Sequence, residues 1–86
     1  METRYVVISL TGPGVGEVEA SHLLFDILNH REGLGWEAGL TLGRTEFLLY
    51  RDVDSDQEFE TELKRLRATL GGEEYAREAD PNGQPI

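Results

Sequence analysis

WEAGLTLGRTEFLLYR, residues 36–51, is typical of a β-hairpin. Its first half, Trp36–Leu42, alternates apolar and polar side chains, as a half-buried strand does. Gly43-Arg44 supplies a two-residue turn with glycine at the first central position. The second half, Thr45–Arg51, has apolar side chains on both faces. We therefore expect the two halves to pair and one face of the first half to carry Trp36, Ala38, Leu40 and Leu42.

A helical pattern lies on each side of this hairpin. From Glu17 to His30, apolar residues recur at helical spacing and form a stripe that consists of Ala20, Leu23, Leu24, Ile27 and Leu28. The second helix begins at a capping box, residues 55–58, and ends at Gly71-Gly72. Its stripe consists of Phe59, Leu63, Leu66 and Leu70. On its surface, Glu60 and Lys64 have the spacing of an i,i+4 ion pair.

Two further strands complete the pattern. Tyr5–Leu10 is rich in β-branched residues and apolar on both faces, which favours a central strand. Glu73–Ala79 is a weaker strand, expected at an edge. This order predicts an α+β fold, a ferredoxin-like βαββαβ sandwich with two helices on one face of a four-stranded antiparallel sheet. We expect a single domain over residues 1–79 and a flexible C-terminal tail over residues 80–86.

This architecture leaves one face of the sheet without helices. The side chains expected there are Tyr5, Val7, Leu48 and Tyr50. An exposed apolar patch often marks an interface or a ligand site, although single apolar side chains are also common on ordinary surfaces. We predict that these four residues form an interface, which joins two copies in a homodimer or holds an apolar ligand.

The composition restricts the partners. The chain has 86 residues, 17 of them acidic against 8 basic, and a net charge of −9. That charge disfavours direct binding to nucleic acid and to anionic membranes, because both rest on Lys and Arg contacts to phosphate. The expected partners are a second copy, a basic protein, or a small molecule such as an amino acid. The apolar run near the N-terminus, Tyr5–Leu10, is too short for a signal or a membrane span, so a cytoplasmic location is expected.

The catalytic and metal motifs are few. With no cysteine, disulfides and thiolate chemistry are excluded. His22 and His30 are too far apart on one helix to share a metal ion, and residues 52–58 do not match a calcium loop. We therefore expect no catalytic residues, no metal site and no cofactor.

The loop GPGVG, residues 12–16, follows a strand and opens a helix. Its backbone N–H groups can bind an anion or a small polar ligand, and a plain tight turn is the alternative. The loop lacks the Gly-Lys-Ser/Thr of a P-loop and the spacing of a dinucleotide fingerprint.

The first third of the chain resembles an ACT domain, a small-molecule-sensing regulatory module. The likeness lies in VVISLTGPG (Val6–Gly14), the helix Ala20–Asn29 and the strand that follows. The resemblance implies a ferredoxin-like fold, pairing of domains, and binding of an amino acid or another small effector near the first loop. It assigns the ligand loop to Gly12, Gly14 and Gly16.

Three functions remain open from the sequence. The first is a small non-enzymatic ligand-binding or regulatory domain, ACT-like and dimeric. The second is an acidic protein-interaction or inhibitor protein that binds a basic partner and could act as a nucleic-acid mimic. The third is a small enzyme of the dimeric ferredoxin-like barrel type.

Overall fold

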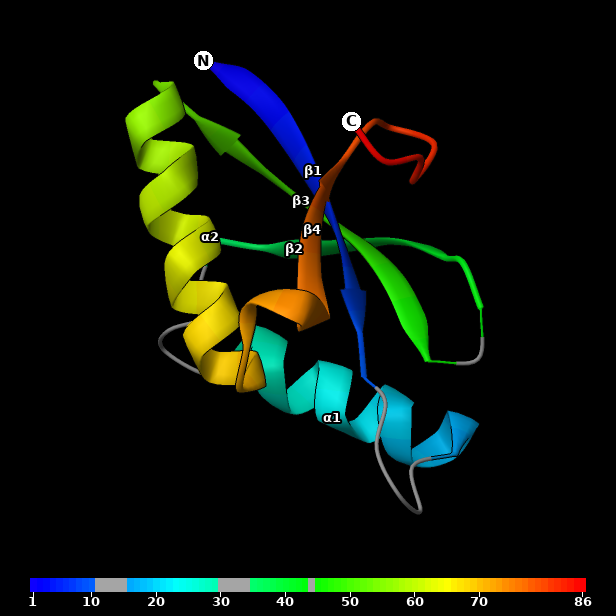
Figure 1. Ribbon diagram of the computed structural model, residues 1–86. Helices are drawn as coiled ribbons and strands as arrows, with labels where there is room; N and C mark the ends of the chain where they lie inside the picture. The colour runs from blue at the N-terminus through cyan, green and yellow to red at the C-terminus, as the bar shows by residue number, and fades with distance from the viewer. Residues whose placement is uncertain (11–15, 30–34, 44) are drawn as a thin grey trace.

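The computed structural model describes residues 1–10, 16–29, 35–43 and 45–86. The helices and strands of these residues follow in the order β1, α1, β2, β3, α2, β4, with a short 3-10 helix, η2, before β4 (Figure 1). The bounds are β1 Glu2–Ser9, α1 Glu17–Asn29, β2 Glu37–Thr41, β3 Glu46–Val53, α2 Asp56–Leu70, η2 Glu73–Tyr75 and β4 Ala76–Ala79.

The strands form one antiparallel sheet in the order β2-β3-β1-β4. β1 and β3 pair along their full length, from Glu2 opposite Val53 to Ser9 opposite Glu46. This is the strand order of the predicted ferredoxin-like sandwich, and the prediction of the fold is confirmed. The two strands with apolar side chains on both faces lie in the centre, where both faces can be covered.

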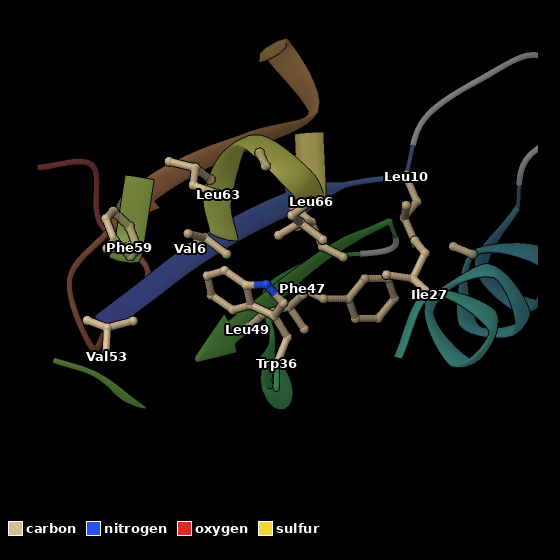
Figure 2. Packing of buried hydrophobic residues seen from close by; sticks show 13 residues of the cluster. Val6, Leu10, Ile27, Trp36, Phe47, Leu49, Val53, Phe59, Leu63 and Leu66 are labelled. Atoms are coloured by element: carbon tan, nitrogen blue, oxygen red, sulfur yellow. The ribbon is translucent and has the colours of Figure 1, made fainter. Parts of the chain in front are cut away.

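The main core lies between the sheet and the two helices. Ala20 and Ile27 of α1 and Phe59, Leu63 and Leu66 of α2 belong to the same buried cluster as one face of β1 and β3. Figure 2 shows labelled side chains of this cluster between the helices and the sheet, with Trp36 among them. Both helices therefore cover the same face, called here the helix face, and the opposite face is called the far face.

Ser55 caps α2 as predicted, but the carboxylate of Glu58 bonds the residue before the cap rather than the Ser55 N–H of a regular capping box. The Ser55 hydroxyl accepts a hydrogen bond from the Glu58 N–H at 3.1 Å, and the Glu58 carboxylate accepts one from the Asp54 N–H at 2.6 Å. At the other end, Gly71 has a φ of 98°, and its N–H donates to the Arg67 and Ala68 carbonyls. Glycine suits this left-handed position because it has no Cβ.

The face predicted for the first hairpin strand is wrong in its second half. Ala38 lies opposite Leu49 and Thr41 opposite Phe47, so β2 uses one more residue than β3 between these pairs. Such a bulge reverses the alternation of side chains. Trp36 is buried on the helix face, whereas Leu40 is 59% exposed. The sequence also predicted a strand over Glu73–Ala79, but its first three residues form η2.

Residues 80–86, for which the sequence predicted a flexible tail, contain a hydrogen-bonded turn. The Asp80 carboxylate accepts hydrogen bonds from the Asn82 and Gln84 N–H groups at 2.8 and 2.9 Å. The Asp80 N–H donates to the Gln84 carbonyl at 2.9 Å, and Pro85 makes a bridge with Ala79. An aspartate that bonds the backbone of the next residues stabilises a turn locally, so the chain folds back after β4 (Figure 1).

Candidate functional site

The predicted ligand loop is described only at its last residue. Gly12 and Gly14 lie outside the described residues. Gly16 precedes α1; its carbonyl accepts from the Ala20 N–H at 2.9 Å, and its N–H donates to the Glu19 carboxylate at 3.2 Å. The Gly16 N–H is therefore occupied by an anionic side chain of the same helix. The ligand role of the three glycines stays a prediction.

The predicted interface on the far face is not exposed at its centre. Val7 and Leu48 lie opposite each other in β1 and β3, and they are only 1% and 3% exposed. They form a second buried cluster with Ala79, against which Tyr5 packs. The expectation of an open apolar patch at Val7 and Leu48 is therefore wrong.

The cover of this cluster comes from the same chain. An atom placed at the Cβ position of Gly83 would lie 2.7 Å from Leu42 Cδ1, so the two residues are in direct contact. Leu42 follows β2 at one edge of the sheet, and Gly83 follows β4 at the other edge. With both helices on the opposite side, this contact places the turn and Leu42 across the far face.

Tyr5 and Tyr50 complete the predicted interface and remain half-buried. Their rings lie 6.1 Å apart at an angle of 41°. Tyr50 also lies opposite Glu37 of β2. The hydrogen bond with the Glu37 carboxylate, together with its negative charge, raises the pKa of Tyr50 above its ordinary value of 10.0.

We expect Tyr50 to be the tyrosine whose titration is shifted upward by Glu37. In a titration of phenolate absorbance, Tyr50→Phe should remove a component above pH 10, and Glu37→Gln should move that component down towards pH 10. Glu46→Gln is the control, because it removes the same charge elsewhere on the far face. The raised pKa adds stability that is complete below the unfolded-state pKa and is lost as pH rises through the folded-state pKa. If Glu37→Gln and Glu46→Gln gave the same phenolate titration curve, the assignment of the shifted pKa to Tyr50 and Glu37 would be contradicted.

Two arginines fasten α2 to the sheet. Arg4 and Arg51 lie opposite each other on the helix face of β1 and β3. Arg4 bonds Asp56 at 2.8 Å and Glu78 at 2.5 Å, and its guanidinium lies 4.1 Å from the centroid of the Phe59 ring. The hydrogen bond with Glu78 raises the pKa of Arg4.

Arg51 has a similar set of partners. It pairs with Glu62 at 3.1 Å and Glu58 at 3.9 Å, and it lies 5.7 Å from the centroid of the Trp36 ring. Its side chain and that of Glu62 are about one-seventh exposed, so loss of either partner would leave a poorly solvated charge. Both arginines are engaged by carboxylates, and they stabilise the fold rather than offer an anion site.

A groove of about 620 Å³ runs along the outer face of α2 and its C-terminal turn. Most of its lining recurs every three or four residues, which defines the side of the helix opposite Phe59, Leu63 and Leu66. The lining residues are Gln57, Glu60, Thr61, Lys64, Arg67, Ala68, Gly71, Gly72 and Glu73. The groove therefore offers two carboxylates and two cationic side chains within a short length.

The two cationic side chains of the groove, Arg67 and Lys64, differ in their hydrogen-bond partners. The Arg67 Nε donates to the Ala76 carbonyl at 3.0 Å, which positions its guanidinium beside β4. Among the lysine and arginine side chains of the described residues, Lys64 alone makes neither an ion pair nor a hydrogen bond. Its expected pairing with Glu60 is therefore not formed. A solvated ammonium next to free carboxylates can bind a ligand that carries both charges.

The groove was missed in the sequence. The spacing of Glu60 and Lys64 was visible, and it predicted only an i,i+4 ion pair. The only signal for a site was that Lys64 is the single lysine of an acidic chain. Which side chains share a concave surface depends on the path of the chain after α2, where Gly71 and Gly72 turn it beside the helix.

Comparison with protein-family models, curated proteins and solved structures finds no match to this chain. Among the described residues, no group of three or more histidine and carboxylate side chains is arranged to hold a metal ion. In that same part of the chain, no helix combines the length and the apolar character needed to cross a bilayer.

Proposed function

We propose that this protein is a small, non-enzymatic ligand-binding or regulatory domain, ACT-like, whose ligand lies in the groove along α2. One observation carries the proposal: Lys64 has no partner within the described chain, although the chain has a net charge of −9 and Lys64 lies beside Glu60. The volume of the groove lies within the range of small-molecule sites, roughly 300–1,000 Å³. The proposal takes the domain to work in the cytoplasm.

The lining favours an amphoteric ligand such as an amino acid. A ligand carboxylate would be placed by Lys64 and Arg67, and a ligand ammonium by Glu60 or Glu73. The resemblance to ACT domains supports the same ligand class, with the loop of Gly12, Gly14 and Gly16 as a second point of contact. Pairing with a second copy is part of the proposal.

Lys64→Ala is expected to weaken amino-acid binding by roughly 10- to 100-fold, because a charge-assisted hydrogen bond contributes about 1.5–3 kcal/mol. The experiment is a calorimetric titration with the amino acids that raise the melting temperature of the wild-type protein. Arg65→Ala is the matched control: it removes the same charge from the adjacent residue, which does not line the groove and pairs with Glu62. Equal affinities of both variants, or a wild-type protein that binds no amino acid, would reject the site.

The charge of the chain favours a second candidate, an acidic domain that docks on a basic protein. Carboxylates cluster at the start of α2, where Asp56 keeps 89% of its side-chain exposure although it bonds Arg4. Such a contact weakens steeply with salt. Salt-sensitive binding of an Arg- and Lys-rich peptide, unchanged in Lys64→Ala and without any amino-acid effect, would support this candidate over the first.

A further inference from the structure

The segment Asp80–Ile86 folds back over the far face, where Gly83 meets Leu42. Its hydrogen bonds lie largely within the segment: three join Asp80 to Asn82 and Gln84, and the Gly83 N–H donates to the Asp80 carbonyl at 2.9 Å. Gly83 is its only buried residue, and Ile86 is exposed. The turn is therefore held together largely by its own hydrogen bonds, and the bridge between Pro85 and Ala79 joins it to β4.

The fit of the segment is incomplete. A hollow of about 200 Å³ lies where the segment meets the start of β1, and its lining includes Thr3, Tyr5, Pro81 and Ile86. The contact that reaches across the far face is that of Gly83 with Leu42. Regions with few buried apolar contacts open locally at a lower free energy than the core, so the segment can lift while the sheet and its helices stay folded.

The surface beneath the segment combines an apolar centre with charges of both signs. Val7, Leu48 and Ala79 form the centre. At its rim, Arg77 and Glu46 form an ion pair at 3.6 Å, and each keeps nearly half of its side-chain exposure. A surface with both charges beside an apolar centre can match itself about a two-fold axis, where the Arg77 of each copy reaches the Glu46 of the other.

We propose that Asp80–Ile86 is an intramolecular cover that keeps the protein monomeric, and that a second copy docks on the far face when the cover lifts. The inference rests on the dimeric part of the proposed function and is independent of the groove along α2. The cover and the second copy compete for Val7, Leu48 and the ring of Tyr5. Because each copy carries a charge of −9, association is strengthened by salt, whereas docking of a basic protein on the same face is weakened.

The test measures self-association by sedimentation velocity for the full chain and for a chain that ends at Ala79. The full chain should be monomeric, and the shortened chain should associate at least about tenfold more tightly, with its helical circular dichroism retained. Adding Leu48→Glu to the shortened chain should restore the monomer. A folded shortened chain that stays monomeric, or a full chain that dimerises with the cover closed, would overturn the proposal.

A second variant covers the case in which the shortened chain does not fold. Gly83 has a φ of 84°, and a Cβ there would meet Leu42, so Gly83→Ala weakens the cover within the full chain. Gln84→Ala is its control, because the Gln84 hydrogen bonds involve only its backbone. Gly83→Ala should associate more tightly than Gln84→Ala; equal association would reject the cover. Either result leaves the Lys64 experiment unaffected, so the two proposals fail separately.

Discussion

Phe59→Ala is expected to lower the free energy of unfolding by about 3–5 kcal/mol, the usual loss for a buried phenylalanine. Phe59 is fully buried and is the largest fully buried side chain of the core. Its ring also supports the Arg4 guanidinium, so the truncation loosens a charged side chain that bonds Asp56 and Glu78. Since a chain of this length has a total stability of roughly 4–13 kcal/mol, the variant should be close to unfolding.

Urea denaturation followed by the fluorescence of Trp36 measures this loss, because the single tryptophan is buried and becomes exposed on unfolding. Phe25→Ala is the matched control: the same substitution on α1, at a side chain that is 70% exposed, should change stability by less than about 0.5 kcal/mol. Similar losses for both variants would mean that Phe59 does not fill the core as described.

Leu48→Ala is expected to lower the free energy of unfolding by about 2–3 kcal/mol, at the lower end for a buried leucine. The reason for the lower end is the small size of the far-face cluster, which comprises Val7, Leu48 and Ala79 with Tyr5 against it. Were the far face open, as the sequence predicted, truncation of Leu48 would have little effect.

Leu40→Ala provides the comparison for Leu48. Leu40 belongs to the neighbouring strand β2 and is largely exposed, so its truncation should change stability by less than about 0.5 kcal/mol. Both variants are followed by urea denaturation with the same probe. A Leu48 variant as stable as the Leu40 variant would show that the turn after β4 does not seal the far face.

Much of the fold could be predicted because its signals are local. Val6, Val7 and Ile8 are consecutive apolar residues, and this pattern predicted a central strand. The structure buries all three and places β1 in the centre of the sheet. The Ser55 cap and the Gly71 stop each depend on backbone geometry within a few residues, so they were visible in the sequence.

The candidate site could not be predicted in the same way. The bulge beside Gly39 inserts one residue and changes the face of every side chain after it, although the alternation in the sequence continues unbroken. The sequence predicted a flexible tail at Asp80, because the position of its turn depends on a contact between Gly83 and Leu42. These two residues are far apart in the chain and come from opposite edges of the sheet. Lys64 was predicted to pair with Glu60, because a helical pattern alone does not show that residues beyond the end of α2 share a groove with it.

The amino-acid order alone determined the elements, their caps and the two central strands, since these follow from side-chain periodicity and from interactions between residues close in the chain. Only the tertiary structure decided what covers the far face and that Lys64 stays without a partner among the described residues. It also decided which face of the sheet Leu40 and Leu42 lie on. Those outcomes depend on contacts between segments far apart in sequence, such as Leu42 with Gly83 and Arg67 with Ala76, and no local pattern encodes such distances.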